Sequence, residues 1–231
     1  ITKKNLLFSK PWVILLLQYS TKYSQAPPQS NQISKKMLEA LITSKTKLKL
    51  LLKFFLNTSN TGYLRGLAAE FNESTNSVRL ELNKLEEAGL LDSKTEGPRK
   101  VFRANPNHPL FTDIQSIVRK YIGIDEIIQR VISLSGNPSR LYLIGNLALG
   151  RDSEQINLII IGEQLDTDYL QQLITKAQKL VTRKIGFLAL TPLEFQQQIP
   201  QLNPEKLLLV WQNDELSTEK SPKDKPGVKS E

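Results

Sequence analysis

The sequence predicts an α+β protein with two domains. The first is a helical domain that carries a β-hairpin, and the second, which follows it in the sequence, is a small α/β domain. Apolar residues recur at helical spacing through residues 33–88, and strand and helix patterns alternate from residue 124 onward. A length of 231 residues is enough for two modest domains. We expect an N-terminal extension or linker over residues 1–32, the first domain over 33–122, the second over 123–212 and a disordered tail over 213–231.

Residues 63–88 predict two short helices separated by a tight turn. The apolar residues of the first helix fall on one helical face, at Leu64, Leu67, Ala68 and Phe71. Asn72 and Glu73 interrupt this pattern, and Ser74 or Thr75 can accept hydrogen bonds from the free amides that begin the next helix. That second helix is expected over residues 75–88 and ends at Gly89. Its predicted apolar face consists of Val78, Leu82 and Leu85, with Leu80 as a further candidate.

A basic β-hairpin is expected directly after the two helices. Residues 90–94 and 101–104 are short strand candidates, and the Gly97-Pro98 pair signals the turn between them. A helix pair, a glycine stop and a basic hairpin follow one another in the order of a winged helix-turn-helix. In that fold the second helix lies in the DNA major groove and the hairpin forms the wing. The sequence therefore predicts double-stranded DNA as a partner.

The predicted DNA-binding residues lie on the outer face of the second helix and on the hairpin. Small polar residues and an arginine near the start of that helix suit base edges, and Arg99 and Lys100 of the hairpin suit phosphate or the minor groove. The full predicted set is Thr75, Asn76, Ser77, Arg79, Asn83, Lys84, Arg99, Lys100 and Arg103. The alternative is a helix-turn-helix module that binds only protein and carries a solvated, charged hairpin.

Composition favours a polyanionic partner. The formal net charge is +8, and residues 33–104 carry more than half of it. The absence of cysteine excludes disulfides, thiolate nucleophiles and cysteine zinc sites, and it fits a reducing cytoplasm. His108, the single histidine, is expected to be a structural loop residue, so no metal site is predicted. The apolar run at residues 12–17 is too short to span a bilayer, so no membrane association is expected.

The second half predicts an alternating α/β pattern. Helices are expected over residues 124–134 and 168–181, and strands over 140–144, 156–162 and 185–190. A short helix opened by Thr191-Pro192 and a last apolar segment, LLLVW, complete the pattern.

Two stretches resemble known families. Residues 33–121, especially SKTKLKLLLKFFL, GYLRGLAAEF, SVRLELNKLEEAGLL and the hairpin, resemble winged-helix transcriptional regulators of the arsenical-resistance-repressor type. Residues 124–211 are similar to the nucleotidyltransferase fold that follows such a winged helix in some bacterial proteins. The resemblance implies a cytoplasmic, sequence-specific regulator of transcription.

The resemblance also implies that the transferase chemistry is lost. In active members a Gly-Ser pair after the first strand holds nucleotide phosphates, and two aspartates at the next strand hold Mg²⁺. The Gly-Ser position falls on Gly145 and Asn146, and the aspartate positions fall on Gln155 and Asn157. The second domain is therefore expected to be a pseudoenzyme for sensing or assembly, without catalytic residues, metal or cofactor.

Several alternatives stay open from the sequence. Gly145, Asn146 and Gly150 are candidates for retained nucleotide binding, or are turn glycines with a capping asparagine. The effector is a nucleotide or a protein, and paired half-sites favour a homodimer. The rival functions are a nucleotidyltransferase with residual activity and a protein-interaction module.

Overall fold

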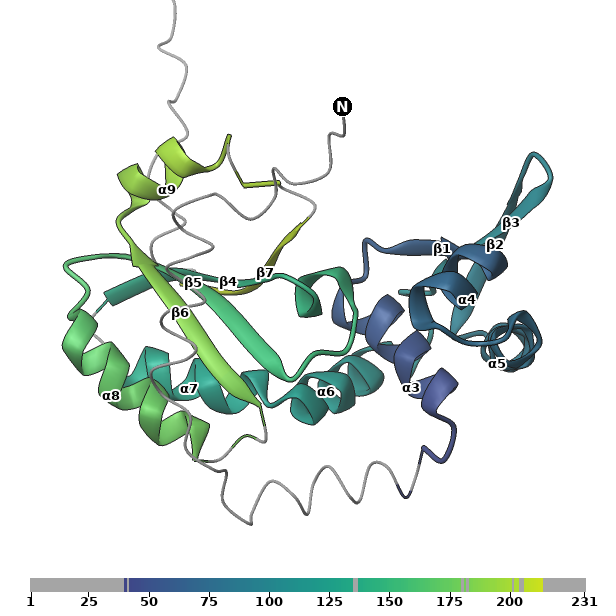
Figure 1. The fold of residues 1–231 in the computed structure, drawn as a ribbon, viewed down its shortest axis with the longest axis horizontal. Helices are drawn as coiled ribbons and strands as arrows, with labels where there is room; N and C mark the ends of the chain where they lie inside the picture. Colours follow the sequence, from purple (N-terminus) through teal and green to yellow (C-terminus); the bar gives the residue numbers. More distant parts are fainter. Residues whose placement is uncertain are drawn as a thin grey trace, which may run out of the picture.

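The computed structural model describes residues 40, 42–134, 137–179, 181, 183–200, 202–203 and 206–213. Within these residues helices accompany one three-stranded and one four-stranded sheet (Figure 1), which confirms the predicted α+β class. The predicted extension over residues 1–32, and the predicted tail beyond residue 213, lie outside the described residues. None of the helices in the described ranges is long and apolar enough to cross a membrane.

Residues 42–122, here called the N-terminal part, contain the three-stranded sheet. β3 lies between β1 and β2 and runs antiparallel to both. The elements of this part are, in order, α3 (Lys45–Leu51), a π-helical turn (Leu52–Leu56), β1 (Thr61–Tyr63), α4 (Leu64–Phe71), α5 (Thr75–Glu87), β2 (Leu91–Glu96), β3 (Arg99–Ala104) and α6 (Phe111–Ile122).

Local signals set the ends of these helices. The Ser44 hydroxyl accepts a hydrogen bond from the Lys47 amide at 3.1 Å and begins α3. Asn72 adopts a left-handed conformation (φ 52°) after α4, and Ser74 then caps α5 by accepting from the Ser77 amide at 3.0 Å. Gly89, with φ 72°, follows α5, as the sequence predicts.

Residues 123–213, here called the C-terminal part, contain the four-stranded sheet in the order β6-β5-β4-β7. Only the β5–β6 pair is parallel among these strands. The elements are α7 (Ile124–Leu134), β4 (Asn137–Ile144), a 3₁₀ turn (Leu147–Leu149), β5 (Gln155–Glu163), α8 (Thr167–Gln178), β6 (Lys184–Leu190), α9 (Pro192–Gln198) and β7 (Leu207–Gln212). Helices α7 and α8 cover one face of this sheet, and α9 lies on the other (Figure 1).

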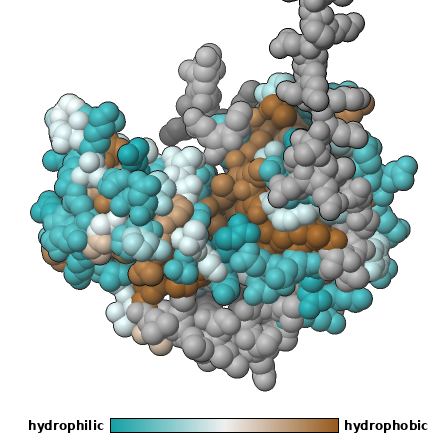
Figure 2. All heavy atoms as spheres, turned by 180° about the vertical axis from the view of Figure 1, so that it is seen from behind, coloured by the Kyte–Doolittle hydropathy of each residue, from teal (hydrophilic) through white to brown (hydrophobic). Residues whose placement is uncertain are grey.

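One hydrophobic cluster runs through both parts of the chain. It begins at Leu50 in α3, includes Val118 and Ile122 of α6, and continues through α7 into β4 and β5. A smaller cluster lies between the opposite sheet face and Phe195 of α9. The surfaces of the two parts differ. In Figure 2 hydrophobic residues gather over the C-terminal part, while the N-terminal part is mostly hydrophilic.

Backbone acceptors of the 3₁₀ turn also join the two parts. The Asn57 amide group donates to the Ala148 carbonyl at 2.8 Å, and the Asn60 amide group donates to the Leu149 carbonyl at 3.1 Å. The Lys53 ammonium donates to the same Leu149 carbonyl at 3.3 Å. These bonds fix the loop that precedes β5 against the π-helical turn and the segment after it.

Two details of the predicted elements are wrong. Leu80, predicted as a further apolar position, is 52% exposed, whereas Glu81 is buried. Two residues correspond to about 200° around a helix, so Leu80 cannot share a face with both Val78 and Leu82. Strand β1, which pairs with β3, is absent from the predicted elements.

Candidate nucleic-acid interface

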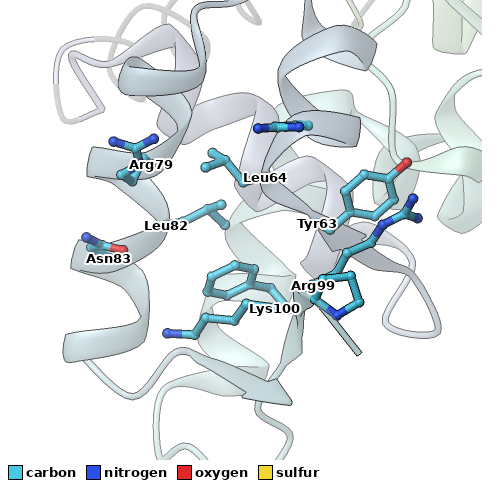
Figure 3. Close-up of a pocket in the computed structure, with 10 residues that line it drawn as sticks. Tyr63, Leu64, Arg79, Leu82, Asn83, Arg99 and Lys100 are labelled. Carbon is cyan, nitrogen blue, oxygen red and sulfur yellow. The ribbon is translucent and has the colours of Figure 1, made fainter. Parts of the chain in front are cut away.

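A cavity of about 810 Å³ lies between α5, the start of α4 and the β2–β3 hairpin. Figure 3 shows Arg79 and Asn83 on α5 at one side of this cavity, and Tyr63 and Arg99 at the other. Leu82 and Phe102, both almost fully buried, also line it. The cationic residues that line it are Arg65, Arg79, Arg99 and Lys100.

The structure brings four of the predicted DNA-binding residues to this cavity, namely Arg79, Asn83, Arg99 and Lys100. Thr75 and Asn76 are exposed in the first turn of α5, Lys84 is exposed one residue after Asn83, and Arg103 is exposed on β3. These four lie outside the cavity lining.

Ser77 has different surroundings from its neighbours in the predicted set. Its hydroxyl is half-buried and lies 2.9 Å from the Thr46 hydroxyl, with which it shares a hydrogen bond. The side chain therefore links α5 to α3. Its predicted contact with DNA stays a prediction.

Several cations of this surface already have carboxylate partners. Lys100 Nζ lies 2.6 Å from Glu86 Oε2, and Lys84 Nζ lies 3.6 Å from Glu81 Oε1. Arg103 pairs weakly with Asp92 at 4.0 Å.

Three arginines around the cavity differ from these paired cations. Within the described part of the chain, no carboxylate lies within ion-pair distance of Arg65, Arg79 or Arg99. Arg65 and Arg79 are exposed, on α4 and α5 respectively, and Arg99 is exposed at the start of β3. Among the described residues no carboxylate neutralises their charges, which leaves them available to an anion.

Glu86 joins α5 to both strands of the hairpin. It accepts hydrogen bonds from the Lys100 ammonium on β3 and from the Ser93 hydroxyl on β2. The Lys100 ammonium, together with the Ser93 hydroxyl, holds the pKa of the Glu86 carboxyl below its ordinary value. The hairpin is thereby fixed against the C-terminal end of α5.

The predicted set omits Arg65 and Tyr63, which also line the cavity. Helical periodicity places Arg65 on the polar face of α4, but it does not show that this face meets α5 and the hairpin. The sequence does offer one signal for Arg65. It lies in the first turn of α4, which is the first of the two helices joined by the tight turn.

The candidate nucleotide-binding loop lies against the N-terminal part. Gly145 (φ 77°) follows β4, Asn146 is exposed, and Gly150 (φ 71°) packs on the backbone of Lys53. A Cβ atom at Gly150 would lie 2.7 Å from Lys53 Cα. This contact gives Gly150 a packing role, and nucleotide binding at the loop stays a prediction.

Gln155 and Asn157 stand on β5, at the positions where the resemblance places the metal-binding aspartates. The Asn157 side chain faces Gly145, which directly follows β4, and Gly186 on β6. The nearby carboxylate of Asp152 is bound to Arg183 at 2.7 Å. The loss of transferase chemistry stays a prediction.

The chain was compared with known families, sequences and structures. No protein-family model matches it, and no curated protein sequence matches it significantly. Among solved structures it has a weak likeness to human N-acetylserotonin methyltransferase in complex with SAM, with a TM-score of 0.24 and 13% sequence identity. The match covers 47% of this chain and 36% of that chain. A likeness of this size supports no inference about fold or function.

Proposed function

We propose that the chain is a sequence-specific DNA-binding regulator of transcription whose N-terminal part is a winged helix-turn-helix. The observation that carries this proposal is a group of three arginines around one cavity that have no carboxylate partner among the described residues, namely Arg65, Arg79 and Arg99. They come from α4, α5 and the β2–β3 hairpin, which are the three elements of a winged helix that approach DNA.

The geometry favours α5 as the helix that enters the major groove. α4 and α5 are joined by a tight turn, and Thr75, Asn76, Arg79 and Asn83 are exposed along α5. Arg79 and Asn83 are separated by about one helical turn and extend on the same side, as Figure 3 shows. Arginine recognises guanine and asparagine recognises adenine through paired hydrogen bonds, so these two side chains would read base edges.

The wing would act beside this helix. Arg99 lies across the cavity from α5 and would contact phosphate or the minor groove. Arg65, in the first turn of α4, would contact phosphate. In this proposal the C-terminal part is a nucleotidyltransferase-like domain without catalytic activity, used for sensing or assembly, and the protein acts on bacterial DNA in the cytoplasm.

Fluorescence anisotropy with labelled duplexes across a salt series tests the proposal. We expect affinity to fall steeply with salt, because arginines that bind phosphate release counterions. Replacing Arg99 with alanine should reduce the magnitude of the slope of log affinity against log salt concentration by about one unit. Arg79→Ala should in addition relax sequence preference by about 1 to 3 kcal/mol at one base pair.

Arg140→Ala provides the matched control. Arg140 is exposed on β4 in the C-terminal part, so its removal lowers the net charge equally without changing the proposed interface. An equal effect of all three substitutions would show that general charge, and not this cavity, binds DNA. If the parent bound no duplex at low salt, the proposal would be wrong.

A further inference from the structure

The Tyr63 ring lies between a helix backbone and the wing arginine. The guanidinium carbon of Arg99 is 4.8 Å from the centre of the ring, within the range of a cation–π contact. Figure 3 shows the two side chains next to each other at the edge of the cavity. Tyr63 is the last residue of β1 and immediately precedes α4, so the contact joins the start of α4 to the hairpin.

Gly66 allows the ring to lie close to α4. A Cβ atom at Gly66 would be 2.9 Å from Cζ of Tyr63, which is closer than real Cβ contacts, and 3.1 Å from both Cε atoms, which is tighter than most of them. Glycine is unfavourable inside a helix, so its presence in α4 calls for a packing reason. The close approach of the Tyr63 ring supplies that reason.

The sheet places Arg99 where the ring can meet it. Tyr63 pairs with Val101 in the β1–β3 register, and Arg99 is two residues from Val101 on the same strand. Side chains two residues apart on a strand point to the same face. Arg99 has no carboxylate partner among the described residues, and the ring lies against its guanidinium.

We propose that Tyr63 is a positioning residue for the wing. Its ring, supported by Gly66, orders the Arg99 guanidinium at the cavity edge before DNA arrives. An arginine that is already ordered loses less conformational entropy on binding, so the same phosphate contact contributes more affinity. This inference rests on the proposed DNA-binding function, and it names the residue that prepares the contact.

A positioning role and a direct phosphate contact differ in their salt dependence. Tyr63 carries no charge that releases counterions, so Tyr63→Leu should weaken duplex binding and leave the salt slope unchanged. The expected loss is about 2- to 5-fold, the size of an exposed cation–π contact. Tyr63→Phe keeps the ring and should bind like the parent. Gly66→Ala should displace the ring and reproduce the effect of Tyr63→Leu.

The full chain is used for the test, with anisotropy measured on the duplex that the parent prefers. Tyr63→Leu and Arg99→Ala are measured separately and together. We expect Tyr63→Leu to have no further effect once Arg99 is absent, because the ring acts through that side chain. In the free protein, the NMR resonance of the Arg99 Nε–H group should carry a ring-current shift that Tyr63→Leu removes and Tyr63→Phe retains. Thermal unfolding of each variant shows that it is folded.

Three results would overturn the positioning role. The first is a full effect of Tyr63→Leu in the Arg99→Ala background. The second is equal weakening by Tyr63→Phe and Tyr63→Leu, which would mean that the hydroxyl contacts DNA. The third is loss of the ring-current shift with no change in affinity. A parent protein that binds no duplex would instead overturn the proposed function, and the positioning role with it.

Discussion

Arg99 and Lys100 are neighbours on β3, yet their charged groups have different partners. The Lys100 ammonium lies 2.6 Å from the Glu86 carboxylate, whereas Arg99 rests on an aromatic ring. A cation that is paired in the free protein gains less from a phosphate, because binding must first break or share the existing pair. Sequence alone assigns the two residues the same role, and the contact with Glu86 separates them.

We therefore expect Lys100→Ala to change the salt slope less than Arg99→Ala does. Glu86→Gln should release Lys100 and raise duplex affinity beyond the effect of removing one negative charge. Glu87→Gln is the matched control, since Glu87 is the next residue of α5, is exposed and has no ion pair within the described ranges. Equal gains in affinity from Glu86→Gln and Glu87→Gln, measured by anisotropy, would contradict this interpretation.

Glu70 forms ion pairs with one residue in each part of the chain. Its carboxylate accepts hydrogen bonds from Lys53 at 2.9 Å and from Arg151 at 3.0 Å. Burial alone would raise the pKa of Glu70, but the bonds and charges of Lys53 and Arg151 outweigh burial and hold this pKa below its ordinary value of 4.5.

A lowered pKa in the folded state means that the ionised carboxylate stabilises the fold. This contribution is present above pH 4.5 and is lost as the pH falls through the lowered pKa. Glu70→Gln should therefore lower the free energy of unfolding at neutral pH, and the difference from the parent should shrink in acid. Urea unfolding at a series of pH values measures this difference, with the exposed Glu163→Gln as control. A difference that is independent of pH would argue against the ionised pair.

At the scale of single elements, α5 depends on one hydroxyl for its first turn. Ser74→Ala removes the acceptor for the Ser77 amide and should lower the free energy of unfolding by about 1 kcal/mol. Ser74→Asp keeps an acceptor at the cap and should retain most of the stability of the parent. Urea unfolding monitored by circular dichroism distinguishes the two variants. Equal losses would show that the serine acts through something other than the cap.

The elements themselves were largely predictable because their signals are local. The cap at Ser74, the glycine after α5 and the apolar face of α4 all act within a few residues. β1 was not predicted, since three residues show no clear alternation and its hydrogen-bonding partner, β3, lies about forty residues further along the chain. The position of Ser77 against Thr46 was missed for a related reason. It depends on how α3 packs against α5. Helical periodicity predicts which face of a helix is buried, but it does not predict which other element covers that face.

At the scale of the whole molecule, the contact between the two parts depends on Gly150. An alanine there would place Cβ 2.7 Å from Lys53 Cα and 2.8 Å from Lys53 O, at a backbone φ of 71°. Gly97 offers a matched comparison, because its φ is 59° and no atom lies within 4 Å of the added Cβ. Both substitutions carry the cost of a left-handed residue, about 1 to 2 kcal/mol. Gly150→Ala should lose about 1 to 3 kcal/mol more because it overpacks the interface.

Urea unfolding of the two alanine variants measures the difference. An equal loss of stability in the two variants would mean that the contact between Gly150 and Lys53 can adjust to the added methyl group without lowering the free energy of unfolding further. The contact itself could not have been predicted, since the sequence gives the order of the two parts but contains no local signal that the loop after β4 packs on the turn after α3.

The junction between the two parts has a consequence for dissecting the protein. α6 ends at Ile122 and α7 begins at Ile124, with the buried Gly123 (φ 80°) between them. A protease therefore meets no exposed connecting peptide there, and among the described residues trypsin should cut first at Arg99 or Lys100 on the exposed hairpin. A chain shortened to stop at residue 122 would end beside Val118 and Ile122, whose hydrophobic cluster continues into α7. Such a fragment would carry uncovered apolar surface into solution and should aggregate more readily than the full chain.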